Sequence, residues 1–323
     1  MTLSRWLLLF GALVAASFLA IAIGTISVPL SAIVDALHGV TDSTPAMVVG
    51  TLRLPRVALA VLVGAGLGMS GAALQGTMRN PLAEPYLLGV SGGAAVGAVI
   101  ATTLGLGATI VPLAAFLGAL VAVAAAFIVA RAASSLGDPR VLLMAGVVVG
   151  AFANAAIMVM LANAESNTVR NALWWMMGSV ADATWTQIAI LLVYVVGGGT
   201  ALVVLARQID VLSLGEDAAA GLGVDVDRAM RNVFVVSSLI AAATVAAAGL
   251  VGFVGLVVPH IVRAAGVRQH RSLVVGSGIA GATLVVLADL LGRTLRPPAE
   301  LPLGAVTALV GVPFFLIKLR RLR

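Results

Sequence analysis

The sequence predicts an all-α membrane protein whose spanning helices form one bundle. Of its 323 residues, 61% are hydrophobic and 10% are charged, and the mean hydropathy is +1.14. A soluble domain usually carries about 25% charged residues. Apolar runs recur along the chain, each close to the ~20 residues that a helix needs to cross ~30 Å of hydrocarbon. We therefore expect a multi-pass membrane protein in which residues 1–323 form a single domain.

Ten apolar segments are expected to cross the bilayer. The first follows Arg5 and is longer than the apolar core of a typical signal peptide, so we expect it to remain in the protein. The second carries Gly64, Gly68 and Ala72 on one helical face, which favours close helix packing. A short surface helix is expected within residues 163–184. The predicted spans are residues 6–26, 56–78, 86–105, 109–131, 141–163, 185–206, 230–250, 257–267, 273–294 and 304–318.

The basic residues predict the orientation of the bundle. Ten spans place both termini on the same side of the membrane. If that side is the cytoplasm, all but five of the 19 Lys and Arg residues lie inside, as the positive-inside rule requires. We therefore expect cytoplasmic termini, and because the basic residues are spread over separate loops, we expect no nucleic-acid partner. The five outside residues are Arg53, Arg56, Arg170, Arg293 and Arg296.

Ionisable residues inside the spans are scarce. Asp289 is the acidic residue that we place within a span, and Arg293 follows it at i+4, a spacing that allows an ion pair. An ion-coupled secondary transporter would need carboxylates in the membrane, so this class remains only an alternative. The chain has no cysteine and three dispersed histidines, so neither a catalytic nor a metal site is expected.

The energy for any active transport must come from another polypeptide. A phosphate-binding GxxxxGK[ST] loop requires a lysine, and the single lysine here is Lys318 in the C-terminal tail. The polar segment 208–229 interrupts the apolar sequence on the predicted cytoplasmic side. Within it, a short helix should begin near Leu214, carry Glu216 in its first turn and end at Gly221 or Gly223. This segment is either an ordinary solvated loop or a docking surface for a partner.

Several long motifs resemble the transmembrane permease subunits of type II ABC importers, the FecCD-like family that takes up iron–siderophore complexes, haem and vitamin B12. The likeness runs from about Thr51 to the C-terminus. It implies ten spans per subunit, a homodimer around the translocation path, two ABC ATPase subunits inside and a periplasmic binding protein outside. It also implies a multi-pass location in the bacterial inner membrane. The motifs are RLPR from Arg53, QGTMRNPLAEPYLLGVSGGAAVG from Gln75, GEDAAAGLGV from Gly215, GFVGLVVPHIVR from Gly252 and AELPLGAVTALVGVPFF from Ala299.

The resemblance also assigns roles to residues. It implies ATPase-coupling contacts at Leu214, Ala218, Ala219, Gly221, Leu222 and Gly223. It implies docking of the binding protein by Arg53, Arg56 and Arg293, although Arg53 and Arg56 could instead anchor the second span at the headgroups. It implies a cytoplasmic gate at Asn80, Leu82 and Asp138, where Asp138 departs from the small hydroxyl residue expected in the family.

The cargo implied by the resemblance is a bulky chelate moved inward by alternating access. A ferric siderophore or haem is the first expectation, and a corrinoid such as vitamin B12 is the alternative. The chain itself is not expected to be an enzyme or to hold a cofactor, because ATP and Mg²⁺ would bind to the partner ATPase subunits.

Overall fold

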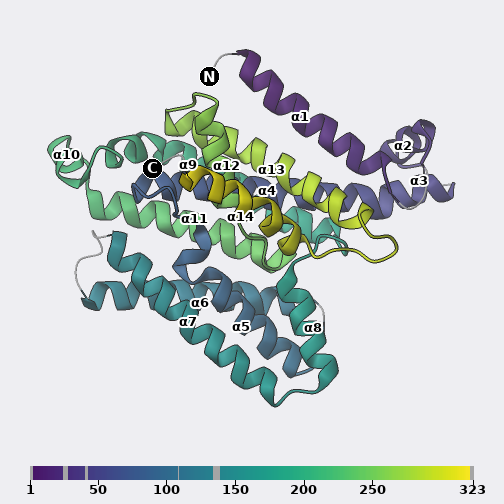
Figure 1. Cartoon of the computed structure of the whole chain (residues 1–323), viewed down its shortest axis with the longest axis horizontal. Coiled ribbons are helices and arrows are strands. Elements are labelled where there is room, and N and C mark those ends of the chain that lie inside the picture. The colour runs from purple at the N-terminus through teal and green to yellow at the C-terminus, as the bar shows by residue number, and fades with distance from the viewer. Residues whose placement is uncertain (1–2, 25–27, 41–42, 108, 134–138, 321–323) are drawn as a thin grey trace.

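The protein is built from helices, as predicted. The computed structural model describes residues 3–24, 28–40, 43–107, 109–133 and 139–320, and every regular element within those ranges is a helix. Figure 1 shows them in one bundle. The elements are α1 (Leu3–Ala22), α2 (Leu30–Leu37), α3 (Thr44–Val48), the π-helix η1 (Val49–Arg53), α4 (Leu54–Thr77), the 3₁₀ helix η2 (Pro85–Leu88), α5 (Val90–Thr103), α6 (Ile110–Ala133), α7 (Pro139–Ala162), α8 (Ser166–Met177), α9 (Trp185–Leu212), α10 (Glu216–Gly221), α11 (Val226–Ala248), α12 (Val254–Ala264), α13 (His270–Thr294) and α14 (Leu303–Arg320).

The ten predicted spans are confirmed as helices in the described part of the chain. Seven helices are long and apolar enough to cross a membrane, and the shorter apolar helices α5, α12 and α14 supply the other three. The predicted surface helix is α8. The span expected over 86–105 is divided, because Gly89 adopts a left-handed conformation (φ +82°) between η2 and α5.

Helix α4 forms the centre of the bundle. In the most apolar 18-residue stretch of this helix, about 78% is buried inside the protein. The same share is 72% for α11, 67% for α13 and 11% for α1. The main hydrophobic core accordingly joins α4 to α9, α11, α12 and α13. Helices α5, α6, α7 and α8 lie together on one side of this centre (Figure 1). Figure 1 also shows α1 on the opposite side, where it contacts α13.

Glycines allow the backbone of α4 to touch its neighbours. A Cβ atom at Gly64 would collide with the carbonyl oxygen of Gly281 in α13, and one at Gly68 would collide with that of Ser277. One turn later, a Cβ at Gly71 would collide with Gly255 in α12. The small-residue face predicted for the second span is therefore confirmed as a contact surface between backbones.

Side-chain hydrogen bonds support the interrupted helices around α12. The Gln75 amide nitrogen donates to the carbonyl oxygens of Gly255 and Leu256, both at 3.1 Å. The Arg263 guanidinium donates to the Gln75 side-chain oxygen at 2.6 Å. The Tyr86 hydroxyl accepts the backbone N–H of Val251 at 3.1 Å. Backbone groups freed by irregular segments are thus satisfied inside the protein, as a membrane environment requires.

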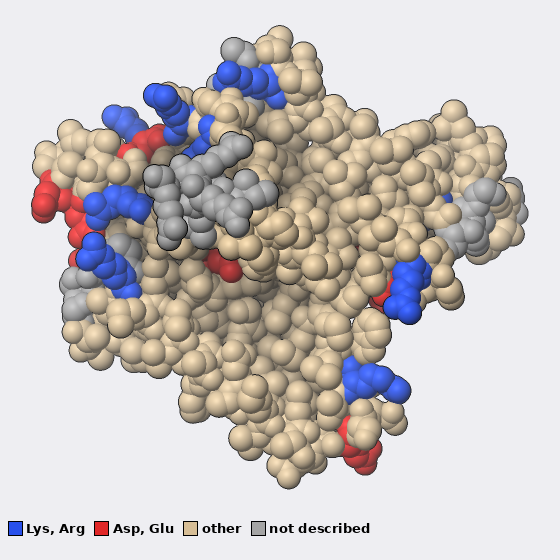
Figure 2. Space-filling view, viewed as in Figure 1, with Lys and Arg blue, Asp and Glu red and all other residues tan. Residues whose placement is uncertain are grey.

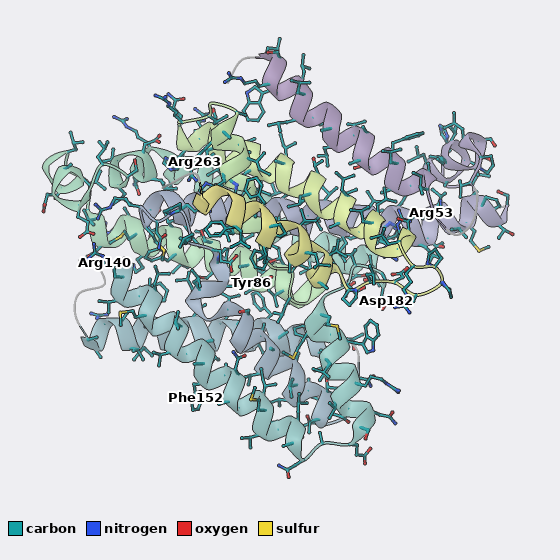
Figure 3. The ribbon with its side chains drawn as sticks, in the orientation of Figure 1. Arg53, Tyr86, Arg140, Phe152, Asp182 and Arg263 are labelled. Carbon is teal, nitrogen blue, oxygen red and sulfur yellow. The ribbon has the colours of Figure 1, made fainter. Side chains whose placement is uncertain are left out.

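The bundle has two distinct ends. Figure 3 places Arg140 and Arg263 towards one end and Arg53 and Asp182 towards the other. Figure 2 shows basic side chains gathered at the end that carries α10, while the long middle of this face has almost no charge. The start of α1 and the end of α14 also lie towards the α10 end (Figure 1). We call these the α10 end and the Arg56 end; that the α10 end faces the cytoplasm stays a prediction.

Candidate functional site

Helix α10 is the short helix predicted in the polar segment, and its sequence explains both of its ends. It begins after Gly215, whose φ of +119° suits glycine, and Glu216 and Asp217 in the first turn face the positive end of the helix dipole. At its C-terminus, the N–H of Gly223 donates to the carbonyl of Ala220, and the N–H of Val224 donates to that of Ala219. With Gly223 at φ +80°, this is a Schellman motif.

The outer face of α10 has no neighbour among the described residues. Leu214 and Leu222, which flank the helix, are 67% and 64% exposed. A Cβ atom at Gly221 would find no atom within 4 Å. Ala219 is the exception, because it is fully buried and fixes the helix to the bundle. Of the predicted coupling residues, Leu214, Ala218, Gly221, Leu222 and Gly223 are exposed.

Polar contacts connect the coupling segment to two other parts of the chain. Asp210, near the end of α9, accepts the backbone N–H of His270 at 3.0 Å and lies 2.6 Å from its ring Nδ1. His270 is buried and is the first residue of α13. On the other side, Arg79 pairs with Glu216 of α10 at 3.2 Å.

The predicted gate residues Asn80 and Leu82 lie directly after Arg79. The Asn80 side-chain oxygen accepts the N–H of Leu82 at 2.9 Å, which closes a tight Asx turn. Leu82 is 44% exposed. The structure thus brings this turn and α10 together through Arg79, whereas the third predicted gate residue, Asp138, falls outside the described residues.

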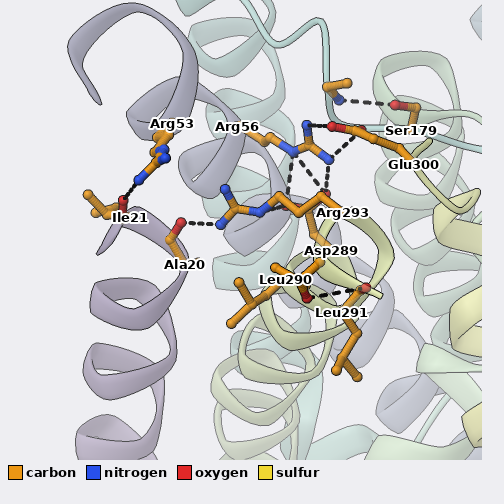
Figure 4. Close-up of polar contacts among 12 residues, drawn as sticks. Ala20, Ile21, Arg53, Arg56, Ser179, Asp289, Leu290, Leu291, Arg293 and Glu300 are labelled. Atoms are coloured by element: carbon orange, nitrogen blue, oxygen red, sulfur yellow. Dashed lines mark hydrogen bonds and ion pairs between the residues drawn. The ribbon is translucent and has the colours of Figure 1, made fainter. Parts of the chain in front are cut away.

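At the Arg56 end, two arginines hold the last turn of α1. Arg53 donates to the carbonyl oxygens of Ile21 and Ala22 at 2.6 and 3.0 Å, and Arg293 donates to that of Ala20 (Figure 4). The last carbonyls of a helix have no partner within the helix and favour a positive charge. Arg53 and Arg293 are only 5% and 9% exposed, so both guanidinium groups belong to the packing of α1.

Arg56 joins two carboxylates. Its guanidinium contacts Asp289 at 2.8–3.0 Å on one side and Glu300 at 2.8 and 2.9 Å on the other (Figure 4). The predicted pair between Asp289 and Arg293 is present at 3.7 Å, but Arg56 is the closer partner. A cavity of about 100 Å³ adjoins this cluster and is lined in part by Trp174 and Ser179.

These contacts bear on the predicted docking of a partner by the outer arginines. All three have partners within the chain: Arg53 and Arg293 contact carbonyls of α1, and Arg56 contacts two carboxylates. Arg56 differs from the other two because its second partner, Glu300, has a side chain that is 46% exposed. A docking role for Arg53, Arg56 and Arg293 stays a prediction.

Three polar residues of the site were missed by the sequence analysis. Glu300 and Arg79 each stand inside a motif quoted above, but their partners lie far away in the sequence, at separations of 244 and 137 residues. Glu84, between two prolines, accepts the backbone N–H of Phe253.

Comparisons with known proteins agree with the geometry. The cobalamin import system permease BtuC of Halobacterium salinarum is 42% identical over 260 residues, which cover 80% of this chain and 69% of that protein. The hemin transport system permease HmuU of Yersinia pestis is 38% identical over 266 residues, covering 80% of this chain and 79% of that one.

A solved structure shares the whole architecture. It shows an inward-facing conformation of a transporter assigned to the metal-chelate type of ABC transporter, with a TM-score of 0.87 and 29% sequence identity. The alignment covers 97% of this chain and 99% of that one. The FecCD transport family matches residues 12–321. The fold, the two ends of the bundle and these matches together show that the chain belongs to the FecCD transport family.

Proposed function

We propose that this chain is the transmembrane permease subunit of an ATP-driven importer that moves a bulky metal chelate into the cell. The observation that carries the proposal is α10, an exposed helix held between the spanning helices α9 and α11 with apolar side chains facing outwards. Exposed apolar side chains at the polar end of a membrane protein, here Leu214 and Leu222, fit a surface that a partner covers. A separate ABC ATPase, which would carry the ATP and Mg²⁺, is the partner that fits.

The contacts of the coupling segment suggest how motion of the ATPase would reach the transport path. A displacement of α10 would act on the Asn80–Leu82 turn through Arg79 and Glu216, and on α13 through Asp210 and His270. We assign the turn to the cytoplasmic gate, together with Asp138. The exposed Arg79–Glu216 pair is weak by itself. The packing of buried Ala219 against the bundle would therefore transmit most of the displacement of α10.

The cargo is proposed from chemistry shared by the relatives. A ferric siderophore or haem remains our first assignment, and the hemin permease supports haem. Vitamin B12 is the alternative cargo. The observation that favours it is the 42% identity to the cobalamin permease. Haem and cobalamin are both large metal macrocycles, so the same wide path would suit either.

The full assembly follows from the same proposal. Two copies of this chain would enclose the path in the bacterial inner membrane, with two ATPases on the α10 end and a periplasmic binding protein on the Arg56 end. The rival class, an ion-coupled carrier, needs a carboxylate that is free to bind the ion. Asp289, the acidic residue placed within a span, is paired with Arg56 and so is not free for that role.

Transport in proteoliposomes tests the proposal. The chain would be reconstituted with an ABC ATPase and a periplasmic binding protein, and labelled hemin, cyanocobalamin and a ferric siderophore would be supplied in parallel. We expect uptake of one chelate class that requires ATP and Mg²⁺ and persists when an uncoupler removes the ion gradient. Uptake without ATP, or uptake abolished by the uncoupler at constant ATP, would contradict it.

A further inference from the structure

A second cavity lies at the α10 end, between the last turns of α9 and the start of α13. Its volume is about 450 Å³. No role above involves this cavity, although Asp210 forms part of its wall. It is lined by Val203, Val204, Ala206, Arg207, Asp210, Gln269 and Arg271.

The rim of this cavity is suited to an anion. Arg207 and Arg271 are exposed, and neither side chain forms a hydrogen bond or ion pair with another residue in the described ranges. Asp210 is the acidic group in the wall, but one of its oxygens is already engaged by His270. Helix α13 begins at His270, so the positive end of its dipole also lies beside the cavity.

The floor of the cavity is suited to hydrocarbon. Val203 and Val204 lie one helical turn from Arg207 towards the middle of the membrane, and Val204 is 75% exposed. Only 28% of the most apolar stretch of α9 is buried, so much of this helix presents apolar surface outside the bundle of the single chain. With 28 residues, α9 is roughly 42 Å long, which exceeds the ~30 Å hydrocarbon core and extends its last turns into the headgroup layer.

We propose that this cavity binds an anionic phospholipid. The phosphate lies between the guanidinium groups of Arg207 and Arg271, and one acyl chain runs along Val203 and Val204. Guanidinium groups form strong charge-assisted hydrogen bonds with phosphate, and basic pockets between membrane helices bind acidic headgroups. The proposal requires only that α9 spans the membrane, so it is independent of the orientation, the cargo and the ATPase.

Native mass spectrometry of the purified chain in detergent tests the site. Phosphatidylglycerol, phosphatidylcholine with the same acyl chains, and inorganic phosphate would be titrated separately. We expect phosphatidylglycerol to bind more tightly than phosphatidylcholine. The double variant Arg207→Gln/Arg271→Gln should weaken phosphatidylglycerol binding roughly tenfold, the size expected for a lost charge-assisted contact. Hydrogen exchange in residues 203–207 and 269–271 should slow when phosphatidylglycerol is added.

A charge-matched control separates this site from general attraction. Arg131→Gln/Arg231→Gln removes two exposed arginines that do not line the cavity, and it should leave phosphatidylglycerol binding unchanged. Equal weakening in both double variants, or no preference for phosphatidylglycerol in the unmodified chain, would overturn the proposal. Inorganic phosphate that displaces the lipid at millimolar concentration would also overturn it, because the acyl contacts would then contribute nothing.

Discussion

At the Arg56 end of the bundle, charged side chains face one another inside the protein, whereas at the α10 end they face outwards. Arg56, Asp289 and Glu300 form one connected cluster, and Asp289 is only 5% exposed. Glu216, by contrast, is 40% exposed and has a single partner, Arg79, which is 45% exposed. The two ends therefore respond differently to the same kind of substitution.

The difference follows from the cost of removing charges from water. A buried guanidinium needs partners inside the protein, and at the Arg56 end carboxylates and helix carbonyls supply them to Arg53, Arg56 and Arg293. The α10 end keeps its charges hydrated and fixes the helix by buried Ala219 and by backbone hydrogen bonds instead. A surface held in this way can accept a partner without first breaking an internal ion pair.

The largest expected effect is at Arg56. Replacement of Arg56 with Ala leaves buried Asp289 without its closest partner and should lower the free energy of unfolding by about 3–5 kcal/mol. Chemical or thermal unfolding in detergent micelles measures the change. Arg296→Ala is the control, because Arg296 is exposed and should shift stability by less than ~0.5 kcal/mol. Equal losses in the two variants would show that the cluster is not a stabilising unit.

The second effect concerns the attachment of α10. Ala219→Leu should destabilise by about 1–3 kcal/mol, because the larger side chain does not fit a fully buried position. Ala220→Leu, on the exposed side of the same helix, should be nearly neutral. Unfolding measurements on both variants test this, and similar values for the two would mean that α10 is not held through Ala219.

Glu300 tests whether Arg56 also has a docking role. Glu300→Gln removes a half-exposed pair and should cost less than ~1 kcal/mol of stability. If Arg56 receives a carboxylate of the binding protein, loss of this internal competitor should raise the affinity about two- to fivefold. Calorimetric titration with the binding protein gives the answer, with the exposed outer acid Glu165→Gln as the control. An unchanged affinity would restrict Arg56 to a structural role.

The smallest expected change in stability is at Gly221. Gly221→Leu should cost nothing in unfolding free energy, because a side chain there enters open space and leucine favours the helix more than glycine. ATP hydrolysis by the assembled transporter should persist while uptake falls, since the added side chain blocks the partner surface. Gly11→Leu, a glycine of α1 with equally open surroundings, should alter neither activity. Normal uptake in Gly221→Leu would count against coupling through α10.

Local signals in the sequence predicted the position of α10 well. They could not predict the contacts of Arg53, Arg56 and Arg293. The first-turn acids and Gly223 specify the ends of α10 within a few residues. Arg56 and Asp289 are 233 residues apart, and the partners of Arg53 and Arg293 are backbone carbonyls, which carry no sequence signature. Charge at the outer side was visible in the sequence, but its pairing depends on how α1, α4 and α13 pack.

The same limit applies to the candidate gate. Asn80 and Leu82 were named as gate residues from the family motif, and the Asx hydrogen bond that joins them is local. Its connection to α10 through Arg79 and Glu216 is a tertiary contact between segments that a single sequence does not relate. The number of spans, in contrast, was predictable because most apolar runs are close to the length that crosses the hydrocarbon core.

The glycine contacts of α4 restrict how the transporter can move. Where side chains interdigitate, two helices can slide by changing rotamers, but where Gly64 and Gly68 meet the backbone of α13, no rotamer is available to change. The contact of Gly71 with α12 extends the same constraint to a third helix. We therefore expect α4, α12 and α13 to move as one rigid body, so that alternating access changes the positions of the surrounding helices relative to them.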